Sequence, residues 1–466
     1  MRSWPRDRIG HCCGLAVVFS VLGLTLAAGG TPTAAGQQVW ASRYDGPGHG
    51  VDGPQAVVVT PDGSKVFVTG SSPGSTGDDD FATAAYATTD GAELWVARYD
   101  GPAHDRDLAS AIAVSPDGSR VFVTGGSYGA PSDSDFATVA YDATSGEQLW
   151  LQRYAGPNGY DGAADVAVSP DGSTVFVTGD STGTTTNIDM GTVAYRADTG
   201  RQVWAQRYNG PGNHWDFGTA VAVSPGGSKV FVTGSSNGKN GDTDFATVAY
   251  SSATGAQLWV SRLSGPCDDW VAAVAISPDG SRVFVTGHRP GAQCQASHFA
   301  TVAYSASNGT QLWERDSLEA FDYAEDVAVA PGGKRVFVTG SDGAGGGDND
   351  YETVAYDAAS GSTLWTSHYD GPGHSYDFAH SVAVSPGGSK VYVTGDSVAE
   401  SYDFGTVAYA AATGTQLWVG RYDGTGHGTD ICLSVAVAPG GRKVFVTGRS
   451  PGPDGLNDYA TVAYTA

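Results

Sequence analysis

The sequence predicts an all-β fold, a single eight-bladed β-propeller with four strands per blade, from three observations. Tryptophan recurs at intervals of 52 to 55 residues, and each interval repeats the same order of apolar runs and turn residues. Glycine supplies 67 of the 466 residues and charged residues only 16%, which is typical of short strands joined by tight turns. Four-stranded units at this spacing are typical of propeller blades, because each twisted sheet buries its faces only against the next one.

The second unit shows the four predicted strands in order. An apolar run at 111–114 is followed by the turn 115–118, Ser-Pro-Asp-Gly, and by a second run at 121–125. Proline and glycine favour the backbone of a tight turn, so these two strands form a hairpin. A Gly/Ser/Asp loop leads to a third run at 136–141 and a fourth that ends on tryptophan. The tryptophans of the eight units are Trp40, Trp95, Trp150, Trp204, Trp259, Trp313, Trp365 and Trp418.

The two ends of the repeat region predict a closed ring. Residues 37–40 have the pattern of a lone fourth strand, whereas the last unit stops after its third strand at 458–464. The first strand is therefore expected to complete the last blade. This closure joins both ends of the chain in one sheet and leaves few free strand edges.

The segment 140–150, Ala-Tyr-Asp-Ala-Thr-Ser-Gly-Glu-Gln-Leu-Trp, resembles the tryptophan-docking repeat of eight-bladed quinoprotein (PQQ-like) propellers. Segments 114–118 and 391–395 are also similar to bacterial secreted propeller repeats of the SBBP and YVTN kinds. The resemblance implies that each of the eight tryptophans locks neighbouring blades together. It specifies a fold far more strongly than a chemistry.

The sequence bears on two catalytic classes, quinoprotein dehydrogenases and serine hydrolases. The PQQ-like resemblance implies a quinone held between a tryptophan and a disulfide of adjacent cysteines, with calcium nearby, but the only adjacent pair is Cys12-Cys13 in the N-terminal segment. We therefore do not expect PQQ as a cofactor. Gly-x-Ser-x-Gly occurs five times, each time opening a Gly/Ser loop after a strand. A hydrolase nucleophile needs a strand, a sharp turn and a helix, so these copies indicate turns.

Residues 1–35 are predicted to be a signal peptide and residues 36–466 the propeller. Three arginines precede an apolar run at 12–28, and Thr33-Ala34-Ala35 offers small residues for cleavage. The run is too short for a membrane anchor, so we expect a secreted or extracytoplasmic bacterial protein with no transmembrane segment after cleavage. The net charge of −24 disfavours nucleic acid and anionic membranes and favours metal cations or cationic ligands.

Two sets of aspartates recur in the loops. The first set precedes each inner strand and is expected to hold the turn by accepting backbone N–H groups: Asp52, Asp107, Asp161, Asp216, Asp269, Asp322, Asp377 and Asp430. The second set precedes the third strand, on the same face of a propeller. Calcium prefers oxygen ligands, so three acidic pairs of this set are weak metal candidates, with solvated loop acids as the alternative: Asp133 and Asp135, Asp242 and Asp244, and Asp348 and Asp350.

Four histidines precede the first acidic set by three residues, in loops of the Gly-Pro-Gly-His type: His49, His104, His374 and His427. They belong to different blades and form no tight cluster, so turn packing or a His–Asp hydrogen bond is expected in preference to zinc.

Three cysteines follow the signal peptide. Cys267 and Cys294 are predicted to form a disulfide, because both fall in loops of blade five that the propeller places on one face and no other unit has a cysteine there. Two unrelated free thiols are the alternative. Cys432 aligns with Ala109 and Ala163 of other inner strands, so a buried free thiol is expected.

Function is expected where the repeats disagree, and blade five departs most from the pattern. Aromatic rings stack on sugar or peptide groups while carboxylates accept hydrogen bonds, although ordinary loop packing also explains such residues. The candidate ligand-binding residues are His214, Trp215, Asp216, Asp269, Trp270, His288, Arg289, His298, Phe321, Asp322, Tyr323 and Tyr376.

The sequence therefore predicts a monomeric, non-catalytic binding or scaffold protein whose partner is a protein or a glycan. The alternatives are a divergent PQQ-dependent oxidoreductase and a carbohydrate-binding, lectin-like ring.

Overall fold

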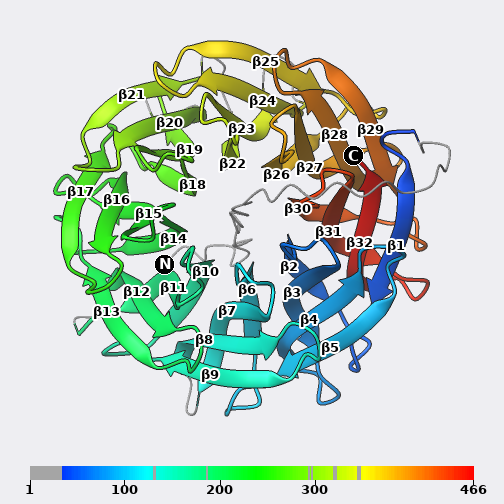
Figure 1. Ribbon diagram of the computed structural model, residues 1–466, viewed down its shortest axis with the longest axis horizontal. Helices are drawn as coiled ribbons and strands as arrows, with labels where there is room; N and C mark the ends of the chain where they lie inside the picture. Colours follow the sequence, from blue (N-terminus) through cyan, green and yellow to red (C-terminus); the bar gives the residue numbers. More distant parts are fainter. Residues whose placement is uncertain are drawn as a thin grey trace.

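The computed structural model describes residues 34–129, 133–184, 187–291, 294, 297–317, 323–343 and 348–466. In these residues 32 strands form eight antiparallel four-stranded sheets, arranged in a ring (Figure 1). The prediction of an all-β, eight-bladed propeller is confirmed. Residues 1–33 of the predicted signal peptide lie outside the described part of the chain.

In each blade the inner strand comes first and the outer strand last. Blade one comprises β2 (Gly53–Val59), β3 (Lys65–Pro73), β4 (Asp79–Ala87) and β5 (Glu93–Tyr99). Blade two comprises β6 (Asp107–Val114), β7 (Arg120–Gly129), β8 (Asp133–Asp142) and β9 (Gln148–Tyr154). Blade three comprises β10 (Asp161–Val168), β11 (Thr174–Thr182), β12 (Ile188–Arg196) and β13 (Gln202–Tyr208). Blade four comprises β14 (Asp216–Val223), β15 (Lys229–Asn237), β16 (Thr243–Ser251) and β17 (Gln257–Leu263).

The other four blades follow the same order. Blade five comprises β18 (Trp270–Ile276), β19 (Arg282–Pro290), β20 (Ser297–Ser305) and β21 (Gln311–Asp316). Blade six comprises β22 (Tyr323–Val329), β23 (Arg335–Asp342), β24 (Asp350–Asp357) and β25 (Thr363–Tyr369). Blade seven comprises β26 (Asp377–Val384), β27 (Lys390–Val398), β28 (Tyr402–Ala410) and β29 (Gln416–Tyr422). Blade eight comprises β30 (Ile431–Val437), β31 (Lys443–Pro451), β32 (Asn457–Thr465) and β1 (Gln38–Tyr44).

The N-terminal strand closes the ring. β1 pairs antiparallel with β32, from Gln38 opposite Tyr464 to Tyr44 opposite Tyr459. Figure 1 shows the blue β1 along the outer edge of the red β32. The prediction that the first strand completes the last blade is confirmed, and the eighth sheet contains both ends of the repeat region.

The outer-strand tryptophans join neighbouring blades. All eight are buried, and seven donate their Nε1–H to a backbone carbonyl oxygen of the next blade, as Trp95 does to Ala143 at 3.4 Å. The turn that receives each ring needs glycine. Gly146, for example, has φ of 73°, and a Cβ there would lie 2.7 Å from the Trp95 ring. The Gly and Trp of the repeat therefore serve the same contact between blades.

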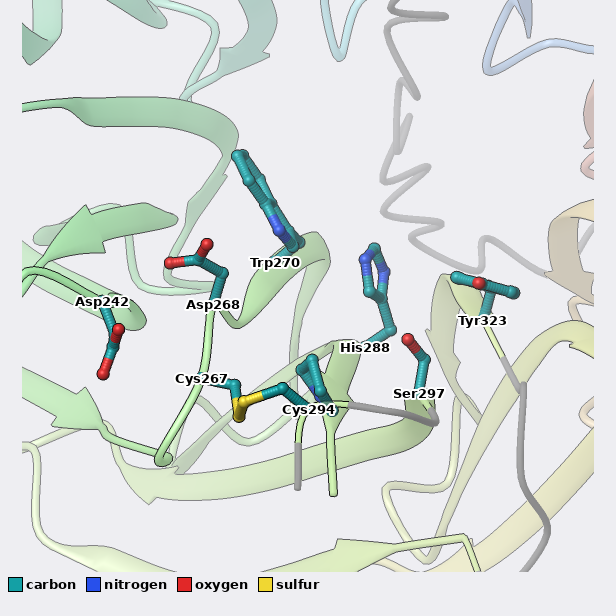
Figure 2. Close-up of a pocket in the computed structure, with 9 residues that line it drawn as sticks. Asp242, Cys267, Asp268, Trp270, His288, Cys294, Ser297 and Tyr323 are labelled. Atoms are coloured by element: carbon teal, nitrogen blue, oxygen red, sulfur yellow. A yellow bond between two sulfur atoms is a disulfide. The ribbon is translucent and has the colours of Figure 1, made fainter. Parts of the chain in front are cut away.

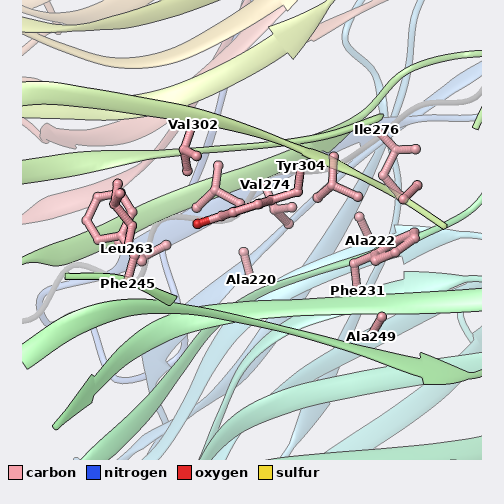
Figure 3. Close-up of a cluster of buried hydrophobic side chains, with 14 of the residues drawn as sticks. Ala220, Ala222, Phe231, Phe245, Ala249, Leu263, Val274, Ile276, Val302 and Tyr304 are labelled. Carbon is pink, nitrogen blue, oxygen red and sulfur yellow. The ribbon is translucent and has the colours of Figure 1, made fainter. Parts of the chain in front are cut away.

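The hydrophobic core is divided among the spaces between adjacent blades. In the cluster between blades four and five, Ala220, Phe231 and Phe245 pack against Val274 and Tyr304 (Figure 3). Among the described residues no helix is long and apolar enough to cross a membrane.

Candidate functional site

The loops that follow the outer strands and the loops that follow the second strands meet on one face of the ring, which we call the loop face. Gly212, after an outer strand, donates its N–H to the carbonyl of Asn237, at the end of a second strand, at 3.1 Å. Likewise the Thr243 N–H donates to Asp268 Oδ1 at 2.8 Å. Loops from neighbouring blades therefore form one continuous surface.

The aspartates before the inner strands hold these loops in place. In six described blades the carboxylate accepts the N–H of a glycine earlier in the same loop: Asp52, Asp107, Asp161, Asp216, Asp377 and Asp430. Burial raises the pKa of these carboxyl groups, to about 6 for Asp52. This arrangement agrees with the expected structural role of the acidic set.

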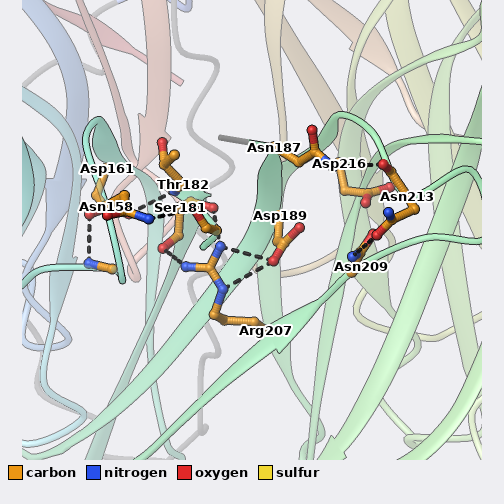
Figure 4. A network of polar contacts seen from close by, with 12 residues as sticks. Asn158, Asp161, Ser181, Thr182, Asn187, Asp189, Arg207, Asn209, Asn213 and Asp216 are labelled. Atoms are coloured by element: carbon orange, nitrogen blue, oxygen red, sulfur yellow. Dashed lines mark hydrogen bonds and ion pairs between the residues drawn. The ribbon is translucent and has the colours of Figure 1, made fainter. Parts of the chain in front are cut away.

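A repeated Arg–Asp–Ser network lies beside each of these acids. In blade three, Arg207 on the outer strand binds Asp189 of the third strand through Nε and Nη2, at 3.1 and 2.9 Å, and also contacts Ser181 of the second strand (Figure 4). Equivalent pairs, at 2.7 to 2.9 Å, are Arg43–Asp458, Arg98–Asp80, Arg153–Asp135, Arg262–Asp244 and Arg421–Asp403. Each arginine stands three residues after the blade tryptophan, a sequence signal that our reading of the repeats missed.

The candidate metal ligands occupy different surroundings. Asp135 and Asp244 are paired with arginine, whereas Asp350 lies with Asp370 and Asp377, their ligand oxygens within 4.8 Å of one another. Burial, and then the charge of Asp370, raises the pKa of Asp350 to about 6. The other candidates, Asp133, Asp242 and Asp348, belong to no such group within the described residues.

The loop histidines bind aspartate through Nδ1. His49, His104, His374 and His427 each lie 2.6 to 2.7 Å from the aspartate four residues earlier. This hydrogen bond raises the pKa of each imidazole. A His–Asp hydrogen bond was expected, and its acceptor is the carboxylate at the start of the loop.

Blade five builds its network with the charges exchanged. The arginine of the outer strand is replaced by Asp316, the serine of the second strand by Arg289, and the aspartate of the third strand by His298. Arg289 extends toward the outer strand, where it pairs with Glu314 and lies 3.6 Å from Asp316. It also lies 3.8 Å from the buried Asp269, whose pKa burial raises to about 7 against the opposing effect of Arg289.

A pocket of about 430 Å³ opens beside this altered network (Figure 2). It is lined by Asp242, Cys267, Asp268, Trp270, His288, Pro290, Cys294, Ser297 and Tyr323. Cys267 and Cys294 form a disulfide with their Cα atoms 5.7 Å apart, which links the loop before the inner strand to the loop after the second strand. His288 packs edge-on against Tyr323, with ring centroids 5.2 Å apart.

An arc of aromatic residues continues the pocket around the loop face. The position at the start of the inner strand is aromatic in four consecutive blades, at Phe217, Trp270, Tyr323 and Phe378, which we call the aromatic arc. Phe217 stacks on Trp270 with centroids 6.0 Å apart. The same position in the other blades holds Gly53, Leu108, Gly162 and Ile431.

The predicted ligand-binding residues divide into several groups. Trp270, His288 and Tyr323 line the pocket, whereas Asp216, Asp269 and Arg289 belong to the loop and ion-pair networks of their blades. His298 lies opposite Arg289 in the register of the blade-five sheet. Trp215 is 52% exposed and its ring contacts that of His214 edge-on. Tyr376 stacks on Phe378. Phe321 and Asp322 lie outside the described residues. Asp268 was missed as a pocket residue, although it is the only acid at the position before the first acidic set.

Comparison with known proteins agrees with this architecture. The family model described as outer membrane protein assembly factor BamB matches residues 134–290, 189–345 and 298–453, more than half of the chain. The chain belongs to this family of PQQ-like propeller repeat proteins. No curated protein sequence matches it.

Solved structures share the fold at low sequence identity. Sqt1 from Chaetomium thermophilum is 14% identical with a TM-score of 0.60, over 93% of this chain and 99% of Sqt1. BamB from Moraxella catarrhalis is 13% identical with a TM-score of 0.52, over 92% of this chain and 99% of BamB. Quinohemoprotein alcohol dehydrogenase from Comamonas testosteroni is 12% identical with a TM-score of 0.55, over 92% of this chain and 76% of the dehydrogenase. These similarities establish the fold alone.

The pocket of this PQQ-like propeller does not fit the quinone cofactor after which the repeat is named. PQQ carries three carboxylates and needs cationic partners, whereas the charged lining residues described here include the acids Asp242 and Asp268 and no arginine or lysine. The disulfide also joins cysteines 27 residues apart instead of adjacent ones.

Proposed function

We propose that this PQQ-like propeller is an exported, non-catalytic binding or scaffold protein that holds a partner on its loop face. The observation that carries the proposal is the departure of blade five from the repeat. Six blades close the loop face with the same Arg–Asp–Ser network, whereas blade five opens a pocket walled by Trp270, His288 and Tyr323. An aromatic-walled cavity with a few polar groups is typical of a binding site.

Two further observations support the partner class and the compartment. Sqt1 has been solved bound to the N-terminus of the ribosomal protein L10, so a propeller of this fold can hold a protein segment. The sequence pattern of residues 1–35 and the Cys267–Cys294 disulfide both favour export to an oxidising compartment.

The test compares two double variants at the same structural position of the ring. Trp270→Ala with Tyr323→Ala removes half of the aromatic arc, and Leu108→Ala with Ile431→Ala removes the aliphatic residues that occupy this position on the other half. Each purified protein is immobilised and used to capture partners from the envelope and medium fractions of the source cells.

We expect the wild type and the aliphatic variant to retain the same partner and the aromatic variant to lose it, with all three giving cooperative thermal melts. Equal capture by the three proteins would overturn the proposal, because binding would then be independent of the arc.

A further inference from the structure

We infer that the blade-five pocket receives the side chain of a basic residue, arginine or lysine, from a peptide segment of the partner. This inference rests on the proposed function, since it names the chemistry of the ligand at that site.

The pocket carries two acids that are not paired with a cation of the described residues. Asp268 and Asp242 line it, and neither forms an ion pair with a residue of the described ranges. The Thr243 N–H holds Asp268 Oδ1 at 2.8 Å, and the Asn240 side-chain amide holds Asp242 Oδ2 at 2.8 Å. Both carboxylates are therefore positioned by neutral donors, and among the described residues no cation is paired with either of them.

The nearby arginine does not neutralise these acids. The Arg289 side chain is 13% exposed and extends toward the outer strand, where it pairs with Glu314 and approaches Asp316. It is not among the residues that line the pocket. In six other blades the network arginine binds the acid of the third strand. Blade five has His298 at that position and Asp316 in place of the outer-strand arginine, so in the described part of the chain its network supplies no cation to the pocket acids.

The walls of the pocket are aromatic. Figure 2 shows Trp270, His288 and Tyr323 in a row, with Asp268 beside Trp270. Indole and phenol rings attract a guanidinium or ammonium group through their negative faces, and arginine also stacks flat on such rings. The pocket thus combines aromatic faces with carboxylates, which is the donor set that an arginine or lysine side chain requires.

A neutral ligand fits this site less well. A sugar would stack on the same rings, but it would cover two carboxylates without supplying a charge, and removing an uncompensated charge from water is costly. A cationic side chain removes this cost. The net charge of −24, and the groups of three carboxylates at other junctions of the loop face, also favour a basic segment over an acidic one.

The experiment uses full-length mature protein and three fluorescein-labelled nonapeptides, measured by fluorescence anisotropy at 150 mM salt. All three have the same Gly/Ser framework, with two arginines, two citrullines or two glutamates. Citrulline has the shape of arginine without its charge, so the comparison isolates the cation.

Asp242→Asn with Asp268→Asn removes the two pocket charges. Glu93→Gln with Glu147→Gln removes two charges from exposed residues on the opposite face, one at the start of β5 and one directly before β9. We expect the arginine peptide to bind the wild type and the control equally, and the pocket variant about tenfold more weakly, equivalent to about 1.4 kcal/mol. The citrulline peptide should bind the wild type about tenfold more weakly than the arginine peptide.

Two results would overturn the inference: no binding of the arginine peptide, or binding that the pocket variant retains, which would place the peptide on acids elsewhere. A glycan array is measured in parallel. If glycans bind in a way that depends on Trp270 and Tyr323 and the peptides do not bind, the inference of a basic side chain is wrong. The proposal of a partner-binding loop face would then still hold. Failure of the aromatic-arc capture experiment would remove the proposed function itself.

Discussion

Replacing Arg289 by serine would leave three carboxylates of blade five without their counter-ion. Asp269 is fully buried at 3.8 Å from the guanidinium, Asp316 lies 3.6 Å away, and Glu314 is in direct contact. Breaking a buried ion pair costs about 3 to 5 kcal/mol, whereas an exposed pair contributes below about 1 kcal/mol. Because Glu314 is 29% and Asp316 46% exposed, we expect the free energy of unfolding to fall by about 2 to 3 kcal/mol.

Two further variants test whether the residues at positions 289, 298 and 316 stabilise the blade only in combination. Asp316→Arg alone places a second guanidinium beside Arg289 and should cost about 1 to 2 kcal/mol through like-charge repulsion. The triple variant Arg289→Ser, His298→Asp and Asp316→Arg gives blade five the serine, aspartate and arginine that six other blades have. It should return to within about 1 kcal/mol of the wild type.

Thermal melts followed by tryptophan fluorescence measure these differences, at roughly 1 °C per kcal/mol in a chain of this size. Arg289→Ser should therefore lower the melting temperature by about 2 to 3 °C, and the triple variant should restore it to within about 1 °C of the wild-type value. If the free energy of unfolding of the triple variant falls by at least the sum of the losses of Arg289→Ser and Asp316→Arg, the three residues do not act as a coupled network.

The remaining predictions concern pH, ring closure and the disulfide. Burial raises the pKa of Asp165 and Asp269 to about 7, so between about pH 4 and 7 the native state binds more protons than the unfolded chain. The free energy of unfolding should fall as pH rises through this window, and a melting temperature higher at pH 7.5 than at pH 5.5 would contradict the assignment. Deleting residues 37–44 removes β1 and exposes the edge of β32, so the melting temperature should drop markedly, and an unchanged melt would exclude the shared blade. Peptide mapping of the unfolded, unreduced mature protein, residues 36–466, should recover linked Cys267 and Cys294 and a single alkylatable thiol at Cys432, whereas three alkylatable thiols would rule out the bridge.

The fold was predictable from sequence because the same residue pattern recurs in every blade. The tryptophan spacing, the Ser-Pro-Asp-Gly turns and the split last blade together define strand number, blade number and closure. The Arg–Asp–Ser network was missed because its three members lie on different strands, and only the register of each sheet shows that Arg207, Asp189 and Ser181 meet. The spacing from tryptophan to arginine was visible, but nothing along the chain identifies its partner.

The pocket was predictable only in part, for a related reason. The aromatic departures at Trp270 and Tyr323 are visible in an alignment of the repeats, so the correct half of the loop face was indicated. Asp268 resembles any other loop acid in sequence. Its importance depends on the absence of a cationic partner in the described residues, and such an absence is a property of three-dimensional placement.

Blade five shows how a repeat protein can gain a binding site while its ring stays closed. The buried Asp269 lies 3.8 Å from Arg289, whereas in six other blades the network arginine comes from the outer strand and binds the aspartate of the third strand. Moving the guanidinium to Arg289 of the second strand keeps a cation beside Asp269 and directs its other contacts outward, to Glu314. The opposite side of the second strand then carries His288 toward the pocket, and the Cys267–Cys294 bridge holds together the two loops that bound it. The site and the rearranged ion pairs are therefore one structural change, and restoring the repeat network in blade five should alter the pocket as well as its stability.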